Sequence, residues 1–252
     1  MAVFLSVNLI ACSSSDDEPS ENGGSNTNKT KKLVEIKEIQ ENYVEIYTFK
    51  YNKDDKLSEI LEYDEGELTC RTTIDWGHNS IIASEIFDDD DIRITTYTLS
   101  NGLIISSKDE RGTIDTYTYN SSNLLTKLHE KWTDGEEDIE TWEWKNDKLV
   151  KYVDDIYDIY TYTYSGKTCK GWAPVTSSDD RMWHEFENDV LFYAHPNLVG
   201  INGTHLPDKI ETNSVDDGTV QIEYTFDEEG YVIMRRGVEE DGYTTIYQYK
   251  WE

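Results

Sequence analysis

The chain has 252 residues, 30% of them charged, and a formal net charge of −29. That balance argues against nucleic acid and against anionic lipid as an electrostatic partner, because both are bound through an excess of Lys and Arg. The 18 Tyr and 7 Trp argue against an acidic disordered chain, since such chains are poor in aromatic residues. We therefore expect a folded domain, and its Tyr, Trp and Thr residues favour strands.

An apolar run from Ala2 to Ala11 opens the sequence. It is too short to span a bilayer as a helix and is typical of the core of a signal peptide. The run ends in Leu9-Ile10-Ala11-Cys12, which resembles the lipobox of bacterial lipoproteins. The resemblance implies a signal segment over residues 1–12 and a lipid on Cys12, which becomes the first residue after cleavage. No Lys or Arg precedes the apolar run, which departs from the family pattern, and a chance match is the alternative.

The motif Ser13-Ser14-Ser15-Asp16-Asp17-Glu18 follows at once and resembles the acidic export signal of Bacteroidetes surface lipoproteins. A solvated linker is the alternative. Residues 13–32 are rich in Ser, Asn, Gly and Thr without an apolar period, so we expect a flexible tether there. These features predict a lipid anchor in the outer membrane and exposure at the cell surface, with the periplasmic side as the alternative.

A hairpin-sized unit recurs about every 20 to 25 residues from residue 43 onward. Its first strand carries aromatic residues at alternate positions, as in Tyr47, Phe49 and Tyr51, with Thr, Glu, Gln or Lys often between them. Alternation places the aromatic side chains on one face of a sheet and leaves the other face more polar. A turn of Asn, Asp, Gly and Ser then leads to a second strand that begins with Leu, as at Leu57 and Leu149.

The hairpin count predicts one all-β domain over residues 33–252. We expect a large antiparallel meander of hairpin repeats with about 16 strands, curled or closed into a barrel-like sheet. An irregular insertion at about residues 170–209 interrupts the repeat. A membrane-spanning barrel is the rival, but it needs an apolar band on every strand, and the polar face is too hydrophilic for one.

Two resemblances accompany this pattern. The Y-x-Y-(turn)-L unit loosely resembles the YD-type repeats of Rhs-like shells. The segment from Ala194 to Gly200, followed by Leu206 to Ile210, resembles a signature of Bacteroidetes lipoproteins that carry a domain of unknown function with a porin-like β fold. The second resemblance covers roughly residues 33 to 252. It implies a large antiparallel sheet curled into a barrel, and it implies no activity.

The insertion is where function tends to lie in a β scaffold. One hypothesis is a ligand or metal site there, built from aromatic and imidazole side chains, and the residues concerned are Trp172, Trp183, His184, Tyr193, His195 and His205. Their spacing matches no known zinc arrangement, so we predict no metal and no cofactor. The favoured interpretation is a structural plug that fills one end of the barrel with aromatic side chains.

Enzyme signatures such as G-x-S-x-G, H-E-x-x-H, a phosphate loop and C-x-x-C are missing from the sequence. We therefore favour a non-catalytic binding or structural module of the cell envelope, with a glycan or another envelope protein as partner. The alternative is a glycan-active hydrolase whose site lies in residues 170–209. The repeated aromatics allow either a sugar-binding platform or cross-strand ladders that stabilise the sheet. Cys70 and Cys169 allow either a disulfide or two buried apolar side chains.

The turns between hairpin units are strongly acidic. In an up-and-down meander alternate turns fall at opposite ends, so we expect these turns along one edge of the sheet. The residues are Asp64, Glu65, Glu67, Asp88, Asp89, Asp90, Asp91, Asp109, Glu110, Asp134, Glu136, Glu137, Asp138, Asp154, Asp155, Glu239, Glu240 and Asp241. The run from Asp88 to Asp91 is a weak calcium candidate. The favoured role of these charges is to keep strand ends soluble and to block edge-to-edge pairing.

Overall fold

A computed structural model describes residues 30–41, 43–88, 91–154, 157–172, 191–201, 203–214 and 218–252. The chain divides into two compact units, residues 1–30 and 31–252, and the second forms the fold described below. Its strands are β1 (Leu33–Gln40), β2 (Tyr43–Tyr51), β3 (Leu57–Asp64), β4 (Glu67–Trp76), β5 (Ser80–Phe87), β6 (Ile92–Ser100), β7 (Leu103–Asp109), β8 (Ile114–Tyr119), β9 (Leu125–Lys131), β10 (Glu137–Lys145), β11 (Lys148–Val153), β12 (Ile159–Thr163), β13 (Lys209–Thr212), β14 (Val220–Phe226), β15 (Val232–Glu239) and β16 (Thr244–Trp251). Between β12 and β13 the described residues include two short helices, α2 (Leu191–Ala194) and η1 (Pro196–Val199). Neither they nor any other helix in the described ranges has the length and apolar composition needed to cross a membrane.

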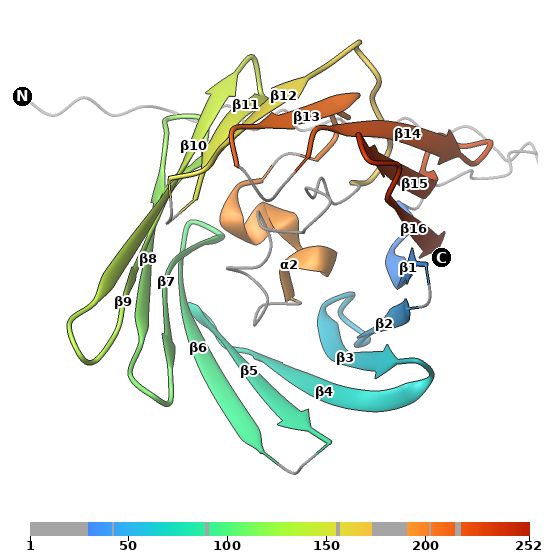
Figure 1. The fold of residues 1–252 in the computed structure, drawn as a ribbon. Helices are drawn as coiled ribbons and strands as arrows, with labels where there is room; N and C mark the ends of the chain where they lie inside the picture. Colours follow the sequence, from blue (N-terminus) through green and yellow to red (C-terminus); the bar gives the residue numbers. More distant parts are fainter. Residues whose placement is uncertain are drawn as a thin grey trace, which may run out of the picture. The chain divides into compact units, whose positions relative to one another are not determined.

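The strands form a closed antiparallel barrel in which each strand pairs with its neighbours in sequence (Figure 1). Closure comes from β1 and β16, where Leu33 lies opposite Trp251 and Gln40 lies opposite Thr245. Closing the sheet leaves no strand edge exposed to other chains. The predicted all-β meander of about 16 strands is confirmed, and the alternative between a curled and a closed sheet is decided in favour of the closed barrel.

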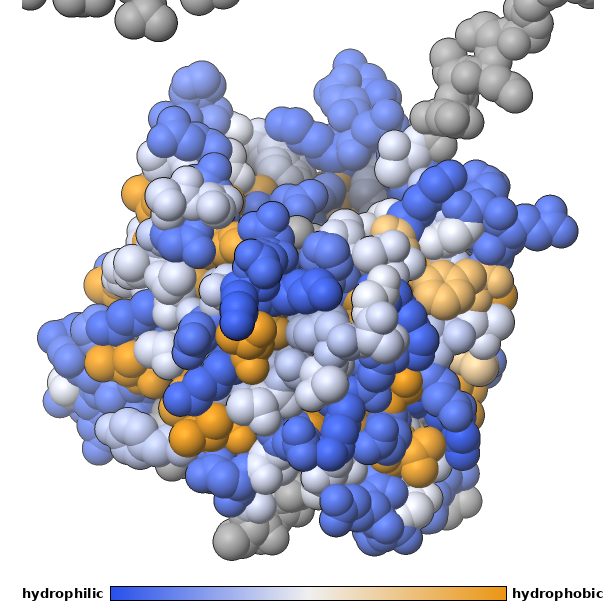
Figure 2. Space-filling model, turned by 90° about the horizontal axis from the view of Figure 1, so that it is seen from above, coloured by the Kyte–Doolittle hydropathy of each residue, from blue (hydrophilic) through white to orange (hydrophobic). Residues whose placement is uncertain are grey.

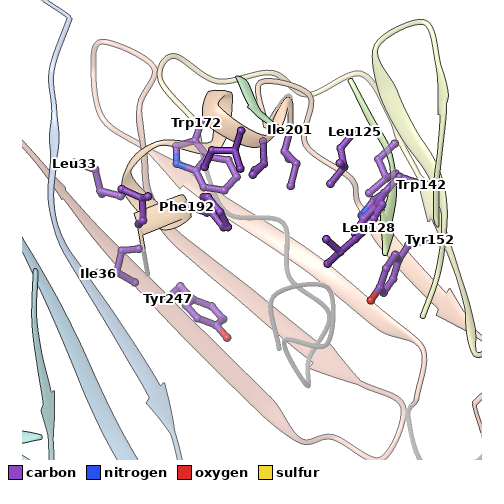
Figure 3. Packing of buried hydrophobic residues seen from close by; sticks show 14 of the residues in the cluster. Leu33, Ile36, Leu125, Leu128, Trp142, Tyr152, Trp172, Phe192, Ile201 and Tyr247 are labelled. Carbon is purple, nitrogen blue, oxygen red and sulfur yellow. The ribbon is translucent and has the colours of Figure 1, made fainter. Parts of the chain in front are cut away.

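Side chains alternate between the interior and the outer wall. On β6, Thr95 and Tyr97 are buried whereas Thr96 and Thr98 are exposed, which is the period of two that strands impose. Wall side chains such as Ile36 and Tyr152 project into an interior that also holds Phe192 (Figure 3). The aromatic repeat of the sequence is therefore the inner face of the barrel.

A ring of hydrogen-bonded aromatic side chains, the aromatic girdle, explains why the repeat ends in Tyr or Trp. Trp144 Nε1 donates to the Leu125 carbonyl oxygen at 2.6 Å, and Tyr164 Oη donates to that of Leu149 at 2.7 Å. In each case the acceptor lies at or close to the beginning of the preceding strand. The other members are Tyr51, Trp76, Tyr119, Tyr224 and Trp251, which donate to the carbonyl oxygens of Leu33, Leu57, Ile104, Pro207 and Val232. These aromatics stabilise the sheet, which favours the ladder interpretation over a sugar platform for the girdle.

Replacing Tyr164 by Phe is expected to lower the free energy of unfolding by about 1 kcal/mol. The change removes the hydroxyl that bonds the Leu149 carbonyl and keeps the ring, so it isolates one hydrogen bond of typical net worth. Urea unfolding measures the difference. The matched control is Tyr157→Phe, because Tyr157 is 79% exposed, and equal losses in the two variants would contradict a stabilising girdle.

The strand order also gives the barrel two different ends. Turns after odd-numbered strands lie at one end, here called the acidic end, and turns after even-numbered strands lie at the other. The turn that contains Asp88 follows β5 and the turn that contains Asp134 follows β9. Both therefore lie at the acidic end, as the hairpin phase of the sequence predicts.

Candidate functional site

The end of the barrel opposite the acidic end is filled by the segment that contains α2 and η1, here called the plug. Phe192, Val199 and Leu206 are completely buried there. The Phe192 ring meets the Tyr97 ring edge-on, with centroids 6.0 Å apart. Figure 1 shows α2 inside the ring of strands, and Figure 3 shows Phe192 and Trp172 among the wall side chains. The described part of the insertion is thus a packed core element.

The plug is docked onto the barrel rim through backbone contacts. Leu125 N donates to the Gly200 carbonyl oxygen at 3.3 Å. Gly200 has a φ of +64°, and a Cβ at this position would lie 2.2 Å from the Asn123 carbonyl oxygen. Glycine is required here because both the left-handed conformation and the close approach leave no room for a side chain.

The structure describes the side chains of three of the sequence-predicted site residues, Trp172, His195 and His205, within or next to the plug. Trp172 is 7% exposed. His195 is buried with its ring 6.3 Å from Tyr51 and 5.6 Å from Trp76, both edge-on. Burial lowers the pKa of His195 to about 4, so the imidazole is neutral at pH 7. His205 pairs with Thr168 through an isolated β-bridge. Trp183, His184 and the side chain of Tyr193 lie outside the described residues.

Metal and disulfide chemistry find little support in the described part of the chain. Within it, no group of three or more His, Cys, Asp or Glu side chains could hold a metal ion. Asp89 and Asp90 lie outside the described residues, so the calcium hypothesis stays a prediction. Cys70 and Cys169 are both free thiols, which decides against the disulfide.

A polar pocket of about 340 Å³ lies at the acidic end, within the lower range of small-molecule sites. It is built by β6 to β9 and by the turns that connect β7 to β8 and β9 to β10. Its lining residues are Arg93, Thr95, Asp109, Arg111, Thr113, Asp115, Leu128, Glu130, Trp132, Thr133 and Asp134. We call it the acidic-end pocket.

Several of the pocket's carboxylates are already engaged by the protein. Asp109 Oδ1 accepts a hydrogen bond from Thr113 N at 2.8 Å, and Asp134 Oδ1 accepts one from Glu136 N at 3.1 Å. Such bonds stabilise turns. Asp115 accepts a hydrogen bond from the Ser107 hydroxyl, and burial raises the pKa of Asp115. The carboxylates thus shape the pocket wall.

The two arginines and the indole of the pocket, unlike its carboxylates, have few partners within the described protein. Arg93 lies with its guanidinium carbon 5.2 Å from the Phe87 ring centroid, and its Nη1 is 3.9 Å from Glu85 Oε2, too far for a hydrogen bond. Arg111 makes no hydrogen bond or ion pair with any residue that the structure describes. The indole N–H of Trp132 likewise has no hydrogen-bond partner in the described ranges. These groups can bind a ligand without breaking a bond within the protein.

The outer wall carries charges along its strands. Glu59 on β3 pairs with Lys50 on β2 and, at 3.3 Å, with Arg71 on β4. Arg236 on β15 pairs with Glu223 on β14 at 3.2 Å. On the face that Figure 2 shows, hydrophobic side chains form small groups that hydrophilic side chains separate. Ion pairs at these positions are unlike the apolar band that a lipid-facing wall presents.

Arg93, Arg111 and Trp132 are not among the residues predicted from the sequence, because the predicted ligand-binding residues all lie in the insertion that breaks the repeat. The pocket comes instead from the repeat itself. The sequence does offer one signal for two of them: Arg111 is a cation and Trp132 an aromatic residue, and both stand in turns at the end where the other turns are mostly acidic.

The barrel resembles solved structures, whereas the sequence comparisons find no match. No protein-family model matches the chain, and no curated protein matches it. A porin-like protein from Bacteroides uniformis ATCC 8492 is similar, with a TM-score of 0.70, 20% identity, and coverage of 89% of this chain and 98% of that chain. A porin-like protein from Bacteroides vulgatus ATCC 8482 has a TM-score of 0.57 and 12% identity, over 87% of this chain and 98% of that chain.

These similarities show the fold, and they confirm the porin-like β fold expected from the sequence. The lipoprotein resemblance stays a prediction. So does the resemblance to YD-type repeats, because a chain in a structure of TcdB2-TccC3-Cdc42 reaches a TM-score of only 0.35, with 14% identity over 79% of this chain and 11% of that chain.

Proposed function

We propose that this chain is a non-catalytic binding module of the bacterial cell envelope, tethered by lipid on Cys12, which binds a small saccharide in the acidic-end pocket. The observation that carries the proposal is the composition of that pocket. It combines the Trp132 ring with Thr hydroxyls and charged side chains in a space of about 340 Å³. A tryptophan ring offers a flat apolar face for the C–H face of a sugar, and hydroxyl, carboxyl and guanidinium groups bond sugar hydroxyls.

The absence of catalysis is supported by the engagement of the pocket's carboxylates. Asp109 and Asp134 accept hydrogen bonds from backbone N–H groups of their own turns. A second candidate function is glycan hydrolysis in this pocket. One observation favours it: two carboxyl groups, those of Asp115 and Glu130, line the same pocket, and burial raises the pKa of Asp115. Glycosidases act through two carboxyl groups, and the pKa of the one that serves as general acid is raised.

A glycan array probed with the folded domain, run beside hydrolysis assays on the same glycans, separates these two functions. We expect binding to a subset of glycans and no reducing ends released. Trp132→Ala should lose the binding, whereas Tyr157→Ala, which removes an aromatic that is 79% exposed elsewhere at the acidic end, should keep it. Turnover of a bound glycan would replace the binding module by the hydrolase.

The envelope location is supported by the lipobox-like motif at Cys12 and by the fold shared with porin-like Bacteroides proteins. We expect the Cys12→Ser variant to be released from membranes, because each buried methylene of an acyl chain contributes about 0.8 kcal/mol to anchoring. Detergent partitioning of both full-length forms measures the effect. If the unmodified sequence also enters the aqueous phase, the lipid anchor is wrong.

A further inference from the structure

The charged groups of the acidic-end pocket fall into two sets when they are sorted by their existing partners. The carboxylates of Asp109, Asp115 and Asp134 accept hydrogen bonds from nearby N–H or hydroxyl groups. The guanidinium of Arg111 donates to no described residue, and that of Arg93 has only the 3.9 Å approach to Glu85 and the Phe87 ring. Glu130, the fourth carboxylate of the lining, also interacts with another residue. Arg111 and Arg93 therefore offer hydrogen-bond donors that no described carboxylate accepts.

We infer that the acidic-end pocket selects saccharides that carry a carboxylate, as in uronic acids, with Arg111 and Arg93 binding the carboxylate and Trp132 packing against the sugar ring. The inference rests on the proposed function and names the ligand class for that site. A guanidinium presents its N–H donors as a planar fork that matches the two oxygens of a carboxylate, and such charge-assisted pairs are stronger than neutral hydrogen bonds.

The fold positions the two arginines and the indole around one space. Arg93 is on the inward face of β6, two residues from the buried Thr95, and its guanidinium lies over the Phe87 ring. A Cβ at Gly112 would lie 2.8 Å from Thr133 Cγ2. The turn that holds Arg111 therefore touches the turn that holds Trp132 and Thr133.

The net charge of −29 opposes an anionic ligand at long range. At physiological ionic strength the Debye length is about 8 Å, so this repulsion is screened outside the pocket while contacts inside it are screened much less. Within the pocket, Asp109, Asp115 and Asp134 already accept hydrogen bonds from the protein. Local arginine donors then determine which sugars bind.

Calorimetric titration with D-glucuronate, its methyl ester and D-glucose, at pH 7 and 0.15 M salt, tests this inference. We expect glucuronate to bind at least about tenfold more tightly than the two neutral sugars, the factor expected for one charge-assisted hydrogen-bonded pair. Arg111→Gln should abolish the preference for glucuronate over the neutral sugars, and Arg111→Lys should retain part of it. The control is Arg236→Gln, an outer-wall arginine paired with Glu223, which should behave like the unaltered protein.

The outcomes separate the inference from the proposed function. Equal affinity of the unaltered protein for all three sugars, or a preference that survives in Arg111→Gln, overturns the carboxylate selection and leaves saccharide binding in place. A folded protein that binds none of these sugars and no glycan on the array overturns both. Because Arg111 is exposed on a turn, its replacement should preserve the cooperative melt.

Discussion

Truncation of Phe192 to Ala is expected to lower the free energy of unfolding by about 3 to 5 kcal/mol. The side chain is completely buried, and its ring meets Tyr97 inside the barrel. Removing the ring leaves a cavity between α2 and the wall that the closed sheet cannot collapse to fill. Urea unfolding measures the loss. Ile94→Ala is the matched control, because Ile94 is 43% exposed on the outer wall and its truncation should change the free energy by about 0.5 kcal/mol at most.

A Phe192→Ala variant as stable as the Ile94→Ala control would mean that the plug is not packed. The metal alternative can be checked with the same proteins. Added zinc should change neither the melting temperature of the unaltered chain nor that of His195→Ala. A large rise that His195→Ala abolishes would make the insertion a metal site after all.

Replacing Glu85 by Gln is expected to stabilise the barrel by about 2 to 3 kcal/mol at pH 8 and to have little effect at pH 4. Burial raises the pKa of Glu85 from 4.5 to about 7, and Arg93 only partly offsets this. Between these values the folded protein keeps a proton that the unfolded chain has lost, so stability falls as the pH rises toward 7. Each unit of difference corresponds to about 1.4 kcal/mol. Gln removes the cost because it stays neutral.

Urea unfolding at pH 4 and pH 8 gives the Glu85→Gln effect, with Glu67→Gln as the control on an exposed strand end. The measured quantity is the difference in the free energy of unfolding between Glu85→Gln and the unaltered protein at each pH, because other groups also contribute to the pH profile of the unaltered protein. His195 gives the opposite pH dependence. Burial lowers its pKa in the folded protein from 6.5 to about 4, so the unfolded chain binds the proton first and the free energy of unfolding falls as the pH falls below about 6.5. Parallel curves for Glu85→Gln and the unaltered protein would show that folding does not raise the pKa of Glu85 and would contradict this prediction.

The wall of the barrel could be predicted from the sequence because its determinants are local. Alternation along each strand and the Asn, Asp and Gly residues of the turns define hairpins one at a time. Closure depends on Leu33 meeting Trp251, a contact between the ends of the domain that local pattern does not specify. The sequence therefore left the curled sheet and the closed barrel as alternatives.

The candidate site could not be predicted in the same way. Arg93, Arg111 and Trp132 belong to three successive hairpins, and they line one space because the barrel curvature and the meander phase bring their ends together. The histidines and tryptophans of the insertion attracted attention because they break the repeat. Among those that the structure describes, Trp172 is buried in the core of the barrel, as expected of a plug that needs apolar and aromatic side chains.

The most direct test of the account is a nitrogen-15 NMR titration of the tryptophan indole N–H signals with a saccharide that the array identifies. Each indole reports its own position in the barrel. We predict that the Trp132 signal shifts with the ligand, while the signals of the girdle residues Trp76, Trp144 and Trp251, whose indoles donate to backbone carbonyls, stay in place. Shifts of the girdle or of the plug residue Trp172, with Trp132 unmoved, would contradict a ligand site at the acidic end.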